Sequence, residues 1–353
     1  MTGGTIRSQS PFGEDNAISA GYRLPMITIY LPYVAPWSWP QFHQHFALRL
    51  LPGLEALEPE RYSRTVRVGD DVGWISVQPL ATHPVLELTL SDSLAEHTVA
   101  LVMRVRKMFD LDTDPTVIAR HFAADPHIGP LVATTPGLRL PSAFDPFEQA
   151  VRAIVGQQVS VKAAVTITRR LVERLGEQWL CLSASRTDGL TKLFPRPETL
   201  ASATLDNIGM PGKRVAALQR LSAAVANGAL ELHTDDGSDA LVRRLCEIPG
   251  IGPWTAEYIA LRGFGEADAF PAADLGLLKA PLWGRNGVTT RELLAPDHKR
   301  GAPGEPTLPC TSGITTGFPH CRLRRGNPRQ HLRSVLEGQR QDQSLSGPWK
   351  YPS

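Results

Sequence analysis

The chain has 353 residues, of which 42% are hydrophobic and 20% charged, values typical of a globular protein with more than one structural unit. No apolar run is long enough to span a bilayer and the N-terminus has no signal-peptide core, so we expect a cytoplasmic protein. Residues 299–353 carry nine Lys or Arg and three Asp or Glu, a net charge of +6, whereas the whole chain carries +2. The rest of the chain is therefore acidic, which excludes a broadly basic surface there.

The first part of the chain is predicted to form a small antiparallel sheet. Residues 1–25 are polar, glycine-rich and without periodicity, which predicts a disordered tail. Residues 26–105 form the predicted sheet domain, in which a helical pattern at Trp39–Leu51 interrupts the strands. The expected strands, two of them joined by a turn at Gly69-Asp70-Asp71, are Met26–Tyr30, Thr65–Val68, Trp74–Gln78 and Val85–Leu90.

Helical spacing dominates the rest of the folded part, so residues 106–298 are predicted to form an all-α bundle. Asp145-Pro146 supplies an N-cap and a first-turn proline for the longest expected helix. The expected helices are Ala95–Phe109, Thr116–Ala123, Phe147–Leu175, Pro197–Ala203, Lys213–Ala226, Ser238–Ile248 and Pro253–Phe264. The predicted fold class is α+β, a small antiparallel sheet domain followed by an all-α bundle.

The run Pro249-Gly250-Ile251-Gly252 is a tight turn between two helical patterns. Glycine lets the backbone come close to a ligand, and the free N–H groups at the start of the second helix suit a phosphate oxygen. Gly250 and Gly252 are therefore candidates for holding one DNA phosphate without reading base sequence. The alternative is an ordinary helix-to-helix turn.

Three side chains near this turn are candidates for chemistry. Trp254 and Tyr258 are four residues apart, hence on one helix face, and could be either core residues or a stacking surface. Asp274 precedes a short helical run and is expected to cap it. A capping carboxylate is held rigidly, and beside a C1′ carbon it would stabilise oxocarbenium character as a base departs. The four cysteines are scattered, so no disulfide framework, metal site or iron–sulfur cluster is expected.

Five motifs occur in order between about Ile27 and about Ala295. They are Val66–Gly69, Pro136–Pro141, Phe147–Ser160, Ile208–Arg214 and the region from Gly250 to Leu275. Together they resemble the helix–hairpin–helix (HhH-GPD) DNA glycosylase superfamily, and within it the 3-methyladenine DNA glycosylase II family. The resemblance implies a TATA-binding-protein-like sheet domain followed by a helix–hairpin–helix glycosylase bundle. It also implies hydrolytic release of alkylated purines, of the 3-methyladenine type, from double-stranded DNA in base excision repair.

The resemblance also implies roles for residues. Asp274 matches the catalytic carboxylate, and Gly250 and Gly252 match the hairpin glycines whose amides grip phosphate. Trp254 and Tyr258 match aromatics that line the pocket for the flipped base.

Two further positions follow from the same resemblance. Gln158 occupies the place of the duplex wedge, where an apolar leucine is familiar. The N-terminal pocket aromatic falls near His45 and Phe46, and the sequence leaves open which of them takes its place.

The residue type at position 254 also distinguishes a monofunctional glycosylase from one that cuts the DNA backbone. Trp254 stands two residues after Gly252, where relatives that cut the DNA backbone carry a Schiff-base lysine. Tryptophan cannot form an imine, so a monofunctional glycosylase is implied, and its indole suits a cationic base. No cofactor or metal is implied, and the expected protein is a monomer that acts on DNA in the nucleoid.

The C-terminus departs from the family, which continues with a helix resembling Trp-Arg-Pro-Trp-Arg-Ala-Tyr-Ala-Ala-Leu-His-Leu-Trp. Lys299–Ile314 can be back-translated so that a shifted frame encodes this segment. We hypothesise a frameshift between about Leu294 and Lys299, which makes residues 299–353 an irregular, out-of-frame tail. Loss of a buried tryptophan alone costs roughly 3–5 kcal/mol, so activity would be impaired.

Two other functions stay open. A glycosylase for deaminated or mismatched bases would need polar groups in the pocket. A non-catalytic or inactivated helix–hairpin–helix DNA-binding protein would keep the hairpin and release no base.

Overall fold

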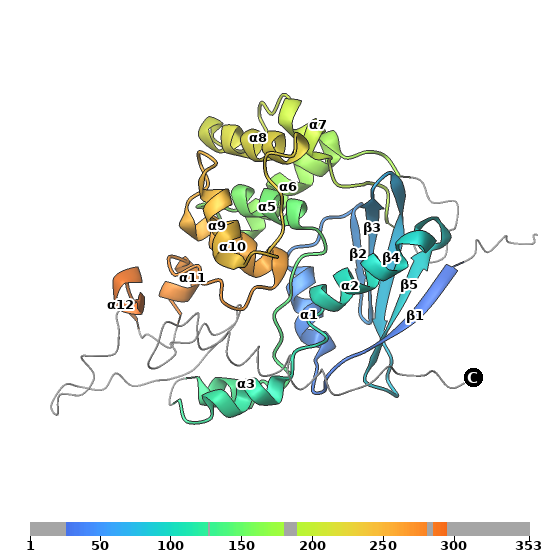
Figure 1. Cartoon of the computed structure of the whole chain (residues 1–353), viewed down its shortest axis with the longest axis vertical. Helices are drawn as coiled ribbons and strands as arrows, with labels where there is room; N and C mark the ends of the chain where they lie inside the picture. Colours follow the sequence, from blue (N-terminus) through green and yellow to red (C-terminus); the bar gives the residue numbers. More distant parts are fainter. Residues whose placement is uncertain (1–25, 126–127, 180–188, 281–284, 295–353) are drawn as a thin grey trace, which may run out of the picture.

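The computed structural model describes residues 26–125, 128–179, 189–280 and 285–294. The expected tails at residues 1–25 and 299–353, and the hypothesised frameshift, lie outside the described residues. The α+β class is confirmed, because an antiparallel sheet domain is followed by a helical domain (Figure 1). No helix in the described part of the chain has both the length and the apolar character to cross a membrane.

The N-terminal domain is built on a five-stranded antiparallel sheet in the order β1-β5-β4-β3-β2. Its strands are β1 (Met26–Pro32), β2 (Glu55–Glu58), β3 (Arg61–Val68), β4 (Asp71–Pro79) and β5 (Val85–Ser91). The predicted turn joins β3 to β4, where Val68 pairs with Asp71. The sequence did not predict β2, because this edge strand is short and has neither β-branched nor aromatic residues.

Two helices close the core of this domain against the sheet. They are α1 (Trp39–Ala47) and α2 (Thr98–Met108), and the short 3-10 helix η1 (Asp92–His97) precedes α2. Aromatic rings dominate the core: the ring centroid of Phe109 lies 5.3 Å from Phe42, 5.4 Å from Phe46 and 6.3 Å from Tyr62. Such ring pairs stabilise a core beyond the area they bury, so α1 is held firmly on the sheet.

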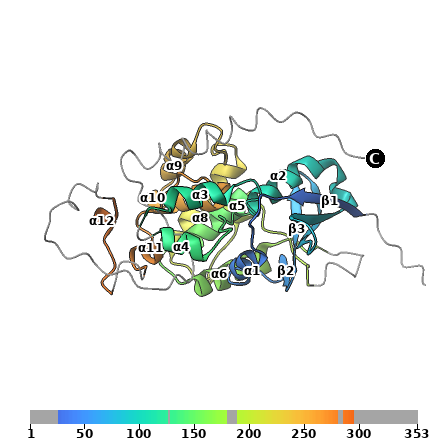
Figure 2. The same ribbon diagram turned by 90° about the horizontal axis from the view of Figure 1, so that it is seen from below.

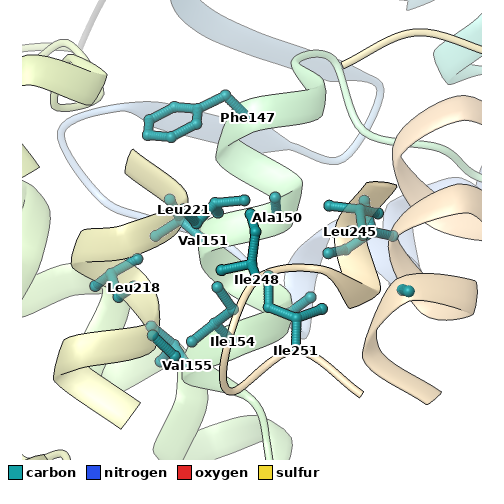
Figure 3. Close-up of a cluster of buried hydrophobic side chains, with 14 of the residues drawn as sticks. Phe147, Ala150, Val151, Ile154, Val155, Leu218, Leu221, Leu245, Ile248 and Ile251 are labelled. Carbon is teal, nitrogen blue, oxygen red and sulfur yellow. The ribbon is translucent and has the colours of Figure 1, made fainter. Parts of the chain in front are cut away.

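The helical domain packs around α5. Its helices are α3 (Pro115–Phe122), α4 (Gly129–Thr134), α5 (Pro146–Val155), α6 (Val161–Leu175), α7 (Pro197–Ser202), α8 (Gly212–Ala226), α9 (Ser238–Cys246), α10 (Pro253–Phe264), α11 (Leu275–Leu278) and α12 (Thr290–Leu294). Asp145 caps α5 as predicted, accepting a bond from the amide of Glu148. Ile154 and Val155 of α5 point toward Leu218 of α8 and toward Ile248 and Ile251, which flank the hairpin turn (Figure 3). The hairpin is therefore anchored in the centre of the core.

The expected continuous helix Phe147–Leu175 is wrong, since α5 and α6 are separate helices joined by residues 156–160. Gly156 ends α5, and the Ser160 side chain caps α6 by accepting a bond from the Ala163 amide. Between them Gln158 adopts a left-handed backbone with φ 56°. The apolar spacing runs on across this turn, so periodicity alone did not reveal the break.

A buried ionic network joins the two domains. Glu148 of α5 pairs with Arg64 of β3 at 2.6 Å and with Arg152 at 2.6 Å. Arg152 reaches Glu55 of β2 at 3.1 Å, and Glu55 also accepts a bond from the Tyr62 hydroxyl at 2.8 Å. Burial would raise the pKa of Glu148, but the two guanidinium groups outweigh it and hold this pKa below 4.5. The network fixes α5 on the sheet, and α1 lies beside the helical domain (Figure 2).

Candidate active site

The hairpin consists of α9, α10 and the turn between them. The two glycines of this turn, Gly250 and Gly252, differ in how much room a side chain would have. Gly250 has φ 103°, and a Cβ there would lie 2.5 Å from the Cβ of Ala217 in α8. Glycine at this position therefore serves the turn and the close packing of α8. Gly252 has φ −95° and a Cβ there would meet nothing within 4 Å. Open space thus lies in front of the start of α10.

The amide groups at this end of α10 are free to bind a ligand. Gly252 is the N-cap of this 12-residue helix and Pro253 is its first residue. Within the described ranges, no backbone carbonyl accepts from the amides of Gly250, Gly252 or Trp254. Gly252 and Pro253 are also exposed. An uncapped, exposed helix N-terminus favours an anion such as phosphate.

One face of α10 carries Trp254, Tyr258 and Arg262 at successive intervals of four residues. The rings of Trp254 and Tyr258 stack with centroids 5.5 Å apart and planes 15° apart. Both side chains are half-buried, whereas Thr255 and Ala256 on the opposite face are buried in the core. The aromatic pair therefore presents ring surface to solvent.

Asp274 is held by three donors beside this pair. Its Oδ1 accepts bonds from the amides of Gly276 at 2.9 Å and Leu277 at 3.2 Å, so it caps α11 as predicted. Its Oδ2 accepts a bond from the indole Nε1 of Trp254 at 3.2 Å. The buried carboxylate of Glu257 accepts from the Phe270 amide at 2.9 Å and ties the incoming segment to α10. The Asp274 carboxylate is thus half-buried and held in one orientation by its three donors.

His45 and Phe46 have different surroundings in the structure. Phe46 is buried and stacks on Tyr62 with centroids 4.6 Å apart, so it belongs to the core of the sheet domain. His45 is half-buried, and its ring meets the Phe46 ring edge to face with centroids 5.7 Å apart. Its pKa lies well below 6.5 because of burial and because of the positive charges of Arg49, Arg262 and Arg152.

Arg262 of α10 is a further charged group near the site, and the sequence reasoning missed it. Burial lowers the pKa of Arg262 and the positive charge of Arg49 lowers it further, while the ionised forms of Tyr258 and Asp274 raise it. Arg262 is thus within electrostatic reach of both Asp274 and His45, and its Nη1 donates to the carbonyl of Pro141 at 3.1 Å. The spacing of four residues after Tyr258 was the available signal.

Gln158 lies apart from the aromatic pair, at the exposed tip of the turn 156–160. Its neighbour Val159 is also exposed. The preceding residue, Gln157, reaches the hairpin: its Nε2 donates to the carbonyl of Gly250 at 3.1 Å. The structure therefore brings the turn 156–160 next to the hairpin turn.

Comparison with known proteins gives two family matches, which meet near the start of α5. Residues 28–145 match the AlkA N-terminal domain, and residues 151–282 match the HhH-GPD superfamily base excision DNA repair proteins. The DNA-3-methyladenine glycosylase 2 of Escherichia coli is 34% identical over 245 residues, which cover 68% of this chain and 82% of that protein.

Two further proteins are similar. The probable bifunctional transcriptional activator/DNA repair enzyme AlkA of Mycobacterium tuberculosis is 38% identical over 266 residues, which cover 75% of this chain. The chain spans only about half of that protein, 51% of its length. The structure of a 3-methyladenine DNA-glycosylase from Archaeoglobus fulgidus matches with a TM-score of 0.60 at 19% identity, covering 76% of this chain and 90% of that one. At this identity the match concerns the fold.

Proposed function

Because the chain belongs to the HhH-GPD superfamily of base excision DNA repair proteins, and within it to the 3-methyladenine DNA glycosylase II family, we propose that it hydrolyses the N-glycosidic bond of alkylated purines in double-stranded DNA. The observation that carries this proposal is the carboxylate of Asp274, held by the indole of Trp254 at 3.2 Å beside the hairpin. The substrates are of the 3-methyladenine type. The enzyme acts as a monomer on DNA in the nucleoid, in the cytoplasm.

The hairpin holds the DNA by its backbone. The amides of Gly250 and Gly252 and the N-terminal end of α10 bind one phosphate, and the space in front of Gly252 admits it. Contacts of this kind position a duplex without reading its sequence. The lesion is therefore recognised after its base has left the helix.

Trp254 and Tyr258 form the surface on which the flipped base stacks. Their centroids are 5.5 Å apart, whereas a base inserted between two rings needs about 7 Å, twice the contact distance between carbon atoms. The base therefore stacks on the free face of the pair. An N-alkylated purine carries a positive charge, which the indole attracts. Trp254 has no amine, so no imine with the sugar forms and the abasic product stays uncut.

Asp274 stabilises the sugar as the bond breaks. The electrons of the C1′–N bond leave with the alkylated base and neutralise its positive charge. A water molecule forms the new bond to C1′ and releases a proton. The developing positive charge on the sugar lies beside the Asp274 carboxylate, and a preorganised anion lowers the energy of this state.

Gln158 fills the gap that the flipped base leaves. Its exposed position at the tip of the turn 156–160 supports this role. Its side chain is polar, so hydrogen bonds to the unpaired base opposite the lesion replace the apolar contact of a leucine. His45, rather than Phe46, is the N-terminal residue of the pocket.

Single-turnover release of free base from duplexes with one defined lesion tests the proposal. We expect release of 3-methyladenine or 7-methylguanine, slower release of hypoxanthine, an abasic strand that stays intact and no covalent complex after borohydride reduction. Binding to the duplex without release of any base would identify a non-catalytic DNA-binding protein. Preferential release of hypoxanthine would identify a glycosylase for deaminated bases.

A further inference from the structure

Gln157 links two parts of the proposed site that are distant in the sequence. Its side-chain nitrogen Nε2 donates to the carbonyl of Gly250 at 3.1 Å and to the hydroxyl of Thr255 at 3.0 Å. Gly250 lies in the hairpin turn and Thr255 in the first turn of α10, whereas Gln157 lies between α5 and α6. One amide group therefore connects the turn 156–160 with the proposed phosphate grip.

The chemistry of the three groups fixes this arrangement. A carbonyl oxygen only accepts hydrogen bonds, so the nitrogen of the amide has to face Gly250, and its two hydrogens match the two acceptors. Thr255 is 3% exposed and packs in the core, so its hydroxyl does not move freely. The acceptors are thus rigid parts of the hairpin, and they hold the side chain of Gln157 from one side.

The tip of the turn is exposed, and Ser160 at its end is held by its bond to the Ala163 amide. Gln158, Val159 and Ser160 are exposed. A left-handed backbone such as that of Gln158, φ 56°, costs about 1–2 kcal/mol for a residue with a side chain. A strained and exposed residue persists only where neighbouring contacts determine its conformation. The adjacent Gln157 supplies such contacts, through the hairpin.

We propose that Gln157 is a positioning residue that couples the phosphate grip of the hairpin to the wedge at Gln158. The inference rests on the proposed function. A phosphate bound at the hairpin turn fixes the register of the duplex. The Gln157 amide fixes the position of the adjacent Gln158 relative to that turn. Gln158 then enters the base stack at the nucleotide that the grip has selected. Without the amide, DNA is still bound but the lesion is unstacked poorly.

The experiment separates binding from unstacking in the full chain. Gln157→Met keeps the length of the side chain and removes both donors, and Thr255→Val removes one acceptor while keeping the shape. Thr255→Ser keeps the hydroxyl. Gln219→Met is the matched control, because Gln219 of α8 also donates to a backbone carbonyl, that of Ala203 at 2.9 Å, away from the turn. The probe is a duplex with a tetrahydrofuran abasic-site analogue and 2-aminopurine as its 3′ neighbour, beside an undamaged duplex.

We expect Gln157→Met to bind undamaged duplex within about twofold of the wild type, and to lose most of the 2-aminopurine fluorescence increase. Base release in single turnover should fall roughly tenfold. Thr255→Val should show a smaller loss in the same direction, the double variant should be no worse than Gln157→Met, and Thr255→Ser and Gln219→Met should resemble the wild type.

If Gln157→Met gave a 2-aminopurine fluorescence increase as large as that of the wild type, the proposed coupling would be overturned. Equal losses of undamaged-duplex affinity and of fluorescence would also overturn it, since these indicate a damaged hairpin. A wild-type protein that unstacks the probe and releases no base refutes the proposed function, and the comparison of variants still decides the coupling. A wild-type protein that does not unstack the probe overturns both.

Discussion

The hydrogen bond between Trp254 and Asp274 allows stacking and carboxylate positioning to be tested apart. Trp254→Phe keeps an aromatic ring against Tyr258 and removes the indole Nε1 that donates to Oδ2 at 3.2 Å. A hydrogen bond to a charged group contributes about 1.5–3 kcal/mol. The distance is at the long end of the usual range, so we take about 1.5 kcal/mol. This corresponds to a roughly tenfold slower reaction.

The assay is single-turnover release of 7-methylguanine from a duplex, together with the affinity for the same duplex. We expect the rate of Trp254→Phe to fall about tenfold and its affinity to change less than threefold, because the ring surface remains. Trp74→Phe, at a buried position in β4, controls for the loss of stability caused by the exchange itself. An unchanged rate, or a loss of affinity as large as the loss of rate, would refute the positioning role of the indole.

Three other predictions concern the buried ionic network, His45 and the proposed wedge Gln158. Glu148→Gln leaves Arg64 and Arg152 buried without their shared counter-charge, so urea unfolding should show a loss of about 3–5 kcal/mol; a loss below about 1 kcal/mol would contradict the network's role. The pKa of His45 lies well below 6.5, so below that pH the unfolded chain binds a proton that the folded protein does not, and the free energy of unfolding falls. Unfolding of His45→Gln between pH 7 and 5 should show a flatter pH dependence than the wild type, and an identical slope would argue against a His45 that stays neutral in the folded protein. Gln158→Gly relieves the left-handed strain and removes the wedge, so its stability should stay within about 1 kcal/mol of the wild type while 2-aminopurine unstacking is lost; retained unstacking would show that another residue is the wedge.

The sequence predicted those parts of the fold that local patterns determine. Four of the strands, the turn at Gly69 and the caps Asp145 and Asp274 follow from alternation, turn chemistry and capping, which act within a few residues. The turn 156–160 was missed because apolar spacing continues from α5 into α6. The strand β2 was missed because its pairing with β3, not its composition, makes it a strand.

Sequence patterns singled out several residues of the candidate site, but not how they are arranged. Sequence spacing placed Trp254 and Tyr258 on one face, but the bond from Trp254 to Asp274 depends on how the segment after α10 folds back. Gly250 illustrates the same limit, since the reason for its missing side chain is Ala217 on another helix. Likewise, the burial of Phe46 in the core of the sheet domain depends on its packing against Tyr62 of β3. Contacts between distant segments decide such points.

The measurement that tests the central claim most directly is base release by Asp274→Asn. The amide keeps the size of the side chain and an oxygen acceptor for the amides of Gly276 and Leu277, but it has no negative charge. With a duplex carrying one 7-methylguanine, we expect release at least about a hundredfold slower than for the wild type, at least about 2.7 kcal/mol of transition-state stabilisation, and duplex affinity within a few fold. Release by Asp274→Asn at the wild-type rate would contradict the assignment of Asp274 as the residue that stabilises the developing sugar cation as the base departs.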